Sequence, residues 1–303
     1  MANAIIADDS RSVRAMLRMV LGELGFTVVA EVENGKDAVD EVKKQDVDLV
    51  LLDINMSIMT GDNAIDPILD ANPEGVIVVP SSLEETRGFT DQLHQKGIPF
   101  ILLDSYMPDL RPLSFYGQDS FCSGFFAAKM LMMLAGNEKE VMLMRQTKDG
   151  HVVSKQQDNR EVGFRHYMHD HFPQIVINVL DLPLNGTRNE YQKMMAQYFD
   201  EHPATHHCIT MTSKAHLVGD YLLKSNRRDV QIMGYDMVGK NAKCLREGSI
   251  SFLIAQHAYM QGYYCVDTLF RAIVLKKKVN PVNYMPIELL MKENIDFYRR
   301  TQI

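Results

Sequence analysis

The sequence predicts an α/β protein with parallel, doubly wound sheets, and three observations support that fold class. Short apolar runs alternate with amphipathic helical stretches, which is typical of a parallel sheet covered by helices. The length of 303 residues exceeds that of a usual single domain, so we expect two lobes. The composition, with 46% hydrophobic and 23% charged residues, indicates an ordinary globular protein rather than a disordered chain.

The chain opens with a strand–helix–strand unit. The apolar run Ala4 to Ala7 predicts a strand, and apolar residues at helical spacing from Val13 to Leu24 predict a helix that Gly25 ends. The same alternation then predicts a strand at 27–32, a helix at 36–44, a strand at 48–54 and a helix at 62–71. The runs "GVIVVPSS" (75–82) and "IPFILLDS" (98–105) continue the pattern with two further strands.

Charge and cysteine content limit the partners and the compartment. The net charge of -7 argues against a nucleic-acid partner, which would require clustered Lys and Arg. The four cysteines lie far apart without a CxxC pair, which indicates reduced thiols rather than zinc ligands or disulfides. The N-terminus lacks a signal-peptide pattern and no apolar run reaches transmembrane length. We therefore expect a cytoplasmic protein without membrane association.

Acidic residues follow two of the first three predicted strands. Asp8 and Asp9 follow the first strand and Asp53 ends the third, so all three fall at the carboxyl edge of the sheet, where functional groups collect. Three neighbouring carboxylates repel one another unless a hard cation such as Mg²⁺ binds them. Taken singly, each acid could instead cap a helix or meet water. The combination predicts a magnesium site.

The motifs "IIADDS", "ENGKDAV" and "DLVLLDINMSIMTG" resemble the first half of a response-regulator receiver domain of the chemotaxis type, over about residues 1–61. This resemblance implies that Asp53 is the phosphoacceptor and that Asp8 and Asp9 position Mg²⁺. A carboxylate nucleophile requires an exposed oxygen at a strand end and a metal that neutralises the incoming phosphoryl group.

The receiver pattern is incomplete in this chain. Ser57 stands where the family has Pro, and Ser81 or Ser82 would have to supply the hydroxyl that follows the fourth strand. After the fifth strand the family has a Lys that pairs with the phosphoryl group, whereas this chain has Leu103 and Asp104. A carboxylate at that place opposes phosphorylation because like charges repel.

From about residue 62 the chain resembles type I periplasmic binding proteins and the effector-binding cores of Lac-repressor-type regulators. The resemblance rests on a series in family order: "EGVIVVPSS", "KGIPFILLDS", "LSFYGQDSFCSGFFAAKML", "NREVGF", "IMGYDMV" and "GSISFLIAQHAYMQGYYCVDTLF". It implies two lobes, one formed by 1–118 with 257–283 and the other by 119–256 with 284–303. It also implies a cleft that takes a sugar or a similar small polar ligand.

The same resemblance implies a set of ligand-binding residues: Asp104, Arg160, Ser213, Asp236 and Gln256. Asp104 would take ligand hydroxyls, and the Arg160 guanidinium would offer several donors. Ser213 replaces the Asn or Asp that relatives usually have. Three of these residues also have an alternative role: Arg160 as a solvated helix residue, Asp236 as a turn former and Gln256 as a hydrogen-bonding residue at the hinge.

The two resemblances together predict a hybrid, engineered by joining half a receiver to a binding-protein body near Gly61. We expect it to bind sugars weakly, because acids replace the aromatic wall of the first lobe. We also expect it to have no enzymatic activity. The alternative is a phosphoacceptor signalling module. Three strands precede "GVIVVP" where a binding protein needs two, which predicts an extra edge strand. The histidines of "RHYMHDH" and "HPATHH" are expected at the surface, and the oligomeric state is not predicted.

Overall fold

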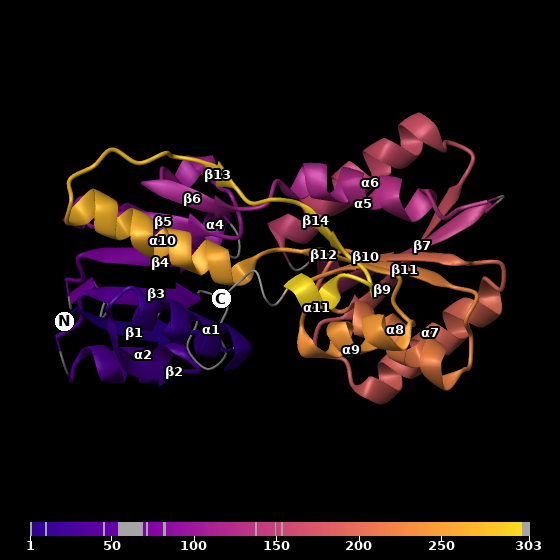
Figure 1. Cartoon of the computed structure of the whole chain (residues 1–303), viewed down its shortest axis with the longest axis horizontal. Coiled ribbons are helices and arrows are strands. Elements are labelled where there is room, and N and C mark those ends of the chain that lie inside the picture. The colour runs from indigo at the N-terminus through magenta and orange to yellow at the C-terminus, as the bar shows by residue number, and fades with distance from the viewer. Residues whose placement is uncertain are drawn as a thin grey trace. The chain divides into compact units, whose positions relative to one another are not determined.

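Two units, each built on its own sheet, make up the chain (Figure 1). The computed structural model describes residues 2–9, 11–44, 46–53, 69–70, 72–80, 83–136, 138–148, 150–152 and 154–298. Unit 1 consists of Met1–Gln118 and His257–Met285, and unit 2 consists of Asp119–Gln256 and Pro286–Ile303. Each unit is therefore discontinuous in sequence.

Within the described residues, the unit 1 sheet contains seven strands, all paired in parallel. In spatial order they are β13 (Asn283–Tyr284), β6 (Ser114–Gly117), β5 (Phe100–Leu103), β4 (Gly75–Val79), β3 (Leu49–Asp53), β1 (Asn3–Ala7) and β2 (Thr27–Val32). The first five strands of the chain thus lie in the order 2-1-3-4-5, which is the flavodoxin-like winding. The predicted α/β class with doubly wound parallel sheets is confirmed.

Both faces of the unit 1 sheet are buried. Ile5, Val50 and Leu52 belong to one hydrophobic cluster, while Ile6 and Leu51 belong to the cluster on the opposite face. Successive side chains of a strand point to opposite faces, so a strand covered on both sides reads as a continuous apolar run. The covering helices are α1 (Arg11–Glu23), α2 (Gly35–Val42), α4 (Leu83–Lys96) and α10 (Ala258–Ile273), with a short 3₁₀ turn η1 (Pro108–Leu110).

Of the three strands that precede β4 in the chain, β2 lies at an edge of the described sheet, whereas β1 and β3 lie inside it. Strand β3 pairs with β1 on one side and with β4 on the other, and the edges of the sheet are β2 and β13. The interior place of β3 agrees with its sequence, since Leu49, Val50, Leu51 and Leu52 are all at most 5% exposed. Such a run is stable only where both faces of the strand are covered.

The described part of unit 2 also forms a sheet of seven strands. Its main path is β14 (Glu288–Leu290), β12 (Phe252–Ala255), β11 (Gln231–Tyr235), β10 (His207–Thr210), β7 (Glu140–Lys148) and β8 (His151–Val152), and β9 (Val176–Pro183) also pairs with β7. The pairs β12–β14 and β7–β8 are antiparallel, and the others are parallel. The central strands are parallel, so their carboxyl ends share one edge.

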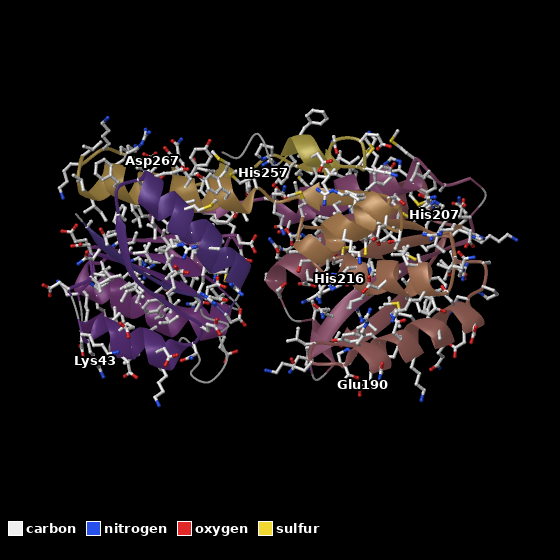
Figure 2. The ribbon with its side chains drawn as sticks, turned by 60° about the horizontal axis from the view of Figure 1, so that its bottom comes forward. Lys43, Glu190, His207, His216, His257 and Asp267 are labelled. Atoms are coloured by element: carbon white, nitrogen blue, oxygen red, sulfur yellow. The ribbon has the colours of Figure 1, made fainter. Side chains whose placement is uncertain are left out.

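Helices cover both faces of the unit 2 sheet, as Figure 1 shows. On one face lie α5 (Ser120–Met132) and α6 (Lys155–His171), and on the other lie α7 (Arg188–Glu201), α8 (Ala215–Lys224) and α9 (Gly239–Glu247). The short helix α11 (Ile295–Tyr298) follows β14. Helix α7 begins with a capping box between Thr187 and Glu190, and Glu190 is labelled in Figure 2. The Thr187 backbone N–H and then the Thr187 hydroxyl donate to the Glu190 carboxylate and lower its pKa.

Some residues named in the sequence analysis lie outside the described residues, and one histidine expected at the surface is buried. Ser57, Ser81 and Ser82 lie outside the described residues, as does most of the helix expected at 62–71. The expectation of surface histidines is wrong for His207, which begins the central strand β10 and is 2% exposed, 3.6 Å from Glu138. Burial lowers the pKa of this imidazole.

The four cysteines are free thiols. Among the described residues, no helix has the length and apolar character needed to cross a bilayer.

Candidate functional site

Three residues at or just beyond the ends of buried strands have left-handed backbone conformations. Asp104 after β5 has φ 73°, Asp236 after β11 has φ 67°, and His257 after β12 has φ 55°. This region is uncommon for residues other than glycine, although Asp and His enter it more readily than most. A strained conformation persists only where the surrounding structure enforces it, and such residues cluster at functional sites. Two of the three, Asp104 and Asp236, are predicted ligand-binding residues.

Arg160 is placed by the close packing of α5 against α6. A Cβ added at Gly124 of α5 would lie 1.9 Å from the Arg160 carbonyl oxygen, and one added at Gly163 of α6 would lie 2.0 Å from the Phe121 carbonyl oxygen. Only glycine allows the two backbones to approach this closely. The start of α6 is fixed by Ser154, whose side chain accepts a hydrogen bond from the Gln157 backbone N–H.

The Arg160 guanidinium is buried, at 2% exposure, in a polar network of unit 2. One Nη donates to the Met211 carbonyl oxygen at 2.9 Å and the other to Gln256 Oε1 at 2.6 Å. Its Cζ lies 3.9 Å from the centroid of the Tyr235 ring, a cation–π contact. Its Nε has no hydrogen-bond partner among the described residues. A buried cation with an unused donor is costly unless a ligand satisfies it.

Gln256 connects Arg160 to Asp236. Its Oε1 accepts from Arg160 and, at 3.0 Å, from Gln156 Nε2, while its own Nε2 donates to Asp236 Oδ1 at 2.6 Å. The two donors on Oε1 and the carboxylate on Nε2 fix the orientation of the amide. The network thus brings together three of the predicted ligand-binding residues, Arg160, Asp236 and Gln256. It also includes Gln156 and Tyr235, which the sequence did not indicate.

Asn241, a fully buried residue of α9, holds the loops around this network. Its Nδ2 donates to the carbonyl oxygens of Ser213, Tyr235 and Asp236 at 2.9 to 3.0 Å. Its Oδ1 accepts from the His216 backbone N–H at 2.9 Å. Sequence reasoning missed Asn241, and the available signal was a polar residue on the buried face of a short helix that follows a strand end. Ser213, a predicted ligand residue, contributes its carbonyl oxygen to this arrangement.

The network contains hydrogen-bond donors and acceptors that belong to groups of opposite charge. Arg160 offers hydrogen-bond donors, whereas Asp236 offers carboxylate oxygens that accept them. Tyr235 lies beneath the guanidinium, where burial raises the pKa of its hydroxyl and keeps the ring neutral. Sugar hydroxyls both donate and accept, so paired donors and acceptors at strand ends suit them.

In unit 1 the three predicted metal ligands do come together. One carboxylate oxygen each from Asp8, Asp9 and Asp53 lies within 4.8 Å of the others, with Asp8 buried, Asp53 half-buried and Asp9 exposed. Two ligands on opposite sides of one Mg²⁺ are about 4.2 Å apart, twice the usual Mg–O distance. The donor type and spacing therefore fit Mg²⁺ after small side-chain movements. Arg14 Nη1 donates to the Asp8 carbonyl oxygen at 2.7 Å and holds this turn.

Asp104 lies in the same unit, after β5. Its backbone N–H donates to the Tyr116 carbonyl oxygen at 2.8 Å, which ties the turn to β6. Asp53 is the last residue of β3, and Asp104 directly follows β5. Strand β4 lies between these two strands in the sheet. A carboxylate thus occupies the strand end where the receiver pattern has a Lys.

Comparison with known proteins gives a family match over most of the chain. A family model described as a periplasmic binding protein domain matches residues 28–278. A solved structure of a LacI transcriptional regulator from Bacteroides fragilis is 34% identical, with a TM-score of 0.81, and the match covers 98% of this chain and 99% of that one. A solute-binding protein from Agrobacterium vitis, solved with α-D-tagatopyranose, shares the fold at 17% identity and a TM-score of 0.74, over 97% and 96% of the two chains.

About a third of the chain is similar to the chemotaxis protein CheY and to a methylesterase/glutaminase. Bacillus subtilis CheY is 34% identical over 98 residues, which are 32% of this chain and 82% of CheY. A protein-glutamate methylesterase/protein-glutamine glutaminase from Haloarcula marismortui is 31% identical over 94 residues, 31% of this chain. The chain spans only 26% of that protein's length.

Proposed function

Because the chain belongs to the periplasmic binding protein domain family, we propose that it binds a small polyhydroxylated ligand of the sugar type and does not transform it. The proposal rests on the network of Arg160, Gln256 and Asp236 in unit 2. The bound α-D-tagatopyranose of the Agrobacterium vitis protein, which shares the fold, supports a sugar as the ligand class. The similarity to a LacI regulator supports a binding role rather than catalysis.

The network recognises hydroxyl groups by geometry. The Arg160 guanidinium is planar, and its contacts with Met211, Gln256 and Tyr235 hold it in one orientation. A ligand oxygen within reach of its unused Nε–H would remove the cost of that buried donor. A ligand hydroxyl would in turn donate to the Asp236 carboxylate, and hydrogen bonds to charged groups are stronger than neutral ones. A neutral polyol is favoured because the network already contains one charge of each sign.

A thermal-shift screen with neutral and acidic monosaccharides tests this proposal. We expect at least one neutral sugar to raise the melting temperature of the wild-type chain, because a ligand that binds the native state stabilises it by mass action. The shift should disappear in Arg160→Lys, which keeps the charge but loses the planar fork. The matched control is Arg165→Lys, a more exposed arginine of the same helix, which should keep it. An equal shift in both variants would place the ligand elsewhere.

A second function is favoured by the convergence of Asp8, Asp9 and Asp53. We propose that this cluster binds Mg²⁺ and that residues 1–61 derive from a receiver domain joined to a binding-protein body. The similarity to Bacillus subtilis CheY over 98 residues supports that origin. We further propose that sugar binding is weakened, because the receiver-derived segment carries acids in place of the aromatic residues that stack on sugars.

Magnesium titration with melting temperature as the readout tests the metal site. Mg²⁺ should stabilise the wild-type chain and should have a much smaller effect on Asp53→Ala, because one of three oxygen donors is lost. The exposed Asp91→Ala of α4 serves as the control, and it should respond like the wild type. Equal stabilisation of Asp53→Ala would remove the case for a receiver-like pocket.

A further inference from the structure

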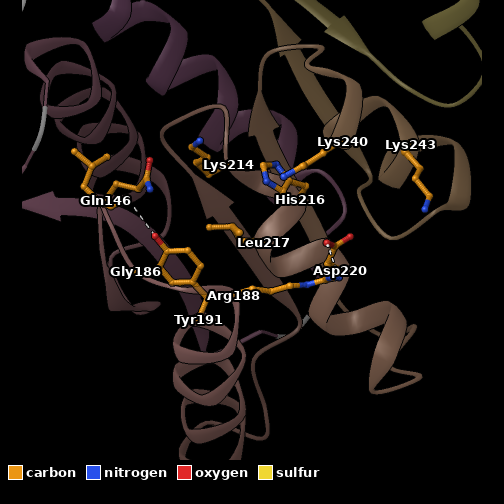
Figure 3. Close-up of a pocket in the computed structure, with 11 residues that line it drawn as sticks. Gln146, Gly186, Arg188, Tyr191, Lys214, His216, Leu217, Asp220, Lys240 and Lys243 are labelled. Carbon is orange, nitrogen blue, oxygen red and sulfur yellow. Dashed lines mark hydrogen bonds and ion pairs between the residues drawn. The ribbon is translucent and has the colours of Figure 1, made fainter. Parts of the chain in front are cut away.

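A pocket of about 520 Å³ lies entirely within unit 2, on the face covered by α7, α8 and α9. It is formed where the chain leaves the carboxyl ends of β7, β9, β10 and β11, and Figure 3 shows the side chains around it. Its polar lining consists chiefly of Gln146, Arg188, Lys214, His216, Asp220 and Lys240. None of the network residues Arg160, Asp236 and Gln256 lines it.

The pocket is strongly cationic in an acidic protein. Arg188, Lys214, Lys240 and Lys243 line it, and Asp220 is the one carboxylate among the described lining residues. Arg188 lies 3.6 Å from Asp220 and Lys243 lies 3.7 Å from Glu247, whereas Lys214 and Lys240 form no ion pair with a described residue. The chain as a whole has a net charge of -7. A cavity lined by one sign of charge concentrates the opposite ion.

Two buried side chains present unused polar atoms to this pocket. Gln146 is 4% exposed, and its carboxamide forms no hydrogen bond with a described residue, although its backbone N–H and carbonyl are bonded to the Gln157 side chain at 3.0 and 2.9 Å. In Figure 3 the carboxamide points toward the side of the pocket that Lys214 and His216 occupy. A buried amide that forms no hydrogen bond costs folding free energy. Because this amide lines the pocket, a polar ligand bound there could supply the missing hydrogen bonds.

His216 contributes the second such atom. The residue is 7% exposed and is labelled in Figure 2. Its Nδ1 lies 2.9 Å from Asn241 Oδ1, and because an amide oxygen only accepts, Nδ1 carries the hydrogen. No described residue bonds its Nε2. Burial lowers the pKa of this imidazole, and Lys240 and Lys214 lower it further.

The starts of two helices add to the positive potential. The N-cap residues of α8 and α9, Lys214 and Val238, form no side-chain cap bond, and of the first N–H groups of α8 that of His216 donates to Asn241 Oδ1. The first backbone N–H groups of a helix and its dipole favour an anion. Natural caps are Ser, Thr, Asp or Asn, so a Lys at this position is unfavourable unless a negative group binds nearby.

We propose that this pocket binds a phosphoryl-type dianion, supplied by inorganic phosphate or by a phosphorylated sugar. Lysine ammonium groups and the Arg188 fork are the usual partners of phosphate oxygens, and the Gln146 amide donates to an oxygen of the same group. Asn241 bonds both His216 and the Asp236 carbonyl, so the pocket borders the hydroxyl-binding network. A sugar phosphate could therefore contact both. The phosphate site itself does not depend on sugar binding.

Calorimetry on the full chain with inorganic phosphate, glucose 6-phosphate and glucose tests the proposal. We expect phosphate to bind the wild type with a dissociation constant below ~10 mM, and the double variant Lys214→Gln/Lys240→Gln to bind at least about tenfold more weakly. The control Lys224→Gln removes an exposed lysine from the far end of α8 and should leave affinity unchanged. Melting temperatures of all variants verify that they fold.

Comparing the affinities for phosphate and glucose 6-phosphate shows whether the pocket binds free phosphate or a phosphorylated sugar. Glucose 6-phosphate binding more tightly than phosphate, with weakening in the same double variant, identifies a phosphorylated sugar. Equal affinity for the two identifies free phosphate. Absence of phosphate binding to the wild type, or binding that persists in the folded double variant, would overturn the proposal. Glucose binding without phosphate binding would leave the hydroxyl network intact and refute only the phosphate site.

Discussion

Replacing Gly124 by Ala tests whether the approach of α5 to α6 sets the position of Arg160. The added Cβ would lie 1.9 Å from the Arg160 carbonyl oxygen, so the backbones must separate by about 1.1 Å to reach even 3.0 Å. If the whole displacement reaches the guanidinium, the Nη2–Oε1 distance to Gln256 grows from 2.6 Å to about 3.7 Å, beyond hydrogen-bonding range.

The energetic cost follows from two effects. Forcing a methyl group into a packed contact costs about 1 to 3 kcal/mol, and losing a hydrogen bond to a charged group costs about 1.5 to 3 kcal/mol. We therefore expect Gly124→Ala to lower the free energy of unfolding by at least about 2 kcal/mol. Sugar affinity should fall by about tenfold to a hundredfold, because Arg160 loses its fixed orientation.

Urea unfolding and calorimetry measure both quantities, with Gly88→Ala as the matched control. Gly88 lies in the interior of α4 and a Cβ there meets nothing within 4 Å, so the substitution should be neutral or stabilising by up to about 1 kcal/mol. A Gly124→Ala variant as stable as Gly88→Ala, with unchanged sugar binding, would refute this packing account.

Three further predictions concern phosphorylation, pH and helix capping. Acetyl phosphate should leave no lasting phosphate on Asp53, because Asp104 stands where a Lys would stabilise it; a persistent mass increase of one phosphate would contradict this. Arg227 donates to Asp229 and lowers the pKa of that carboxyl to about 2, so its contribution to stability is present above the unfolded value near 4 and is lost as pH falls from about 4 to about 2. Urea midpoints measured across that range should fall less steeply in Asp229→Asn, and identical slopes would show that the pair contributes nothing. Thr187→Ala should cost about 1 kcal/mol of unfolding free energy through loss of the α7 capping box, and an unchanged urea midpoint would argue against that role.

The sequence predicted the layout of unit 1 well because its signals are local. The apolar run of β1, the helical spacing after it and the stop at Gly25 all reflect short-range patterns, and Gly25 has the expected positive φ of 82°. The convergence of Asp8, Asp9 and Asp53 followed from one topological rule, that parallel strands share a carboxyl edge. Strand counting carries no information about lateral order, so the sequence did not assign β3 its place between β1 and β4.

The unit 2 site was predicted in part. Arg160, Asp236 and Gln256 were assigned from family motifs, and the structure brings them together. Gln156 and Asn241 were missed because their roles depend on bonds to residues 100 and 28 positions away in the sequence. The basic pocket was missed for the same reason, since its lysines come from separate elements and form no run in the sequence.

The most direct test of the central claim is calorimetry of a neutral monosaccharide, identified by the thermal-shift screen, with the wild type and with Asp236→Asn. This substitution keeps the size of the side chain and removes the charge that accepts hydroxyl hydrogens. The account predicts measurable binding to the wild type and at least about tenfold weaker binding to Asp236→Asn, while the exposed Asp200→Asn of α7 binds like the wild type. Equal affinity of Asp236→Asn and the wild type would contradict the assignment of the sugar site to this network.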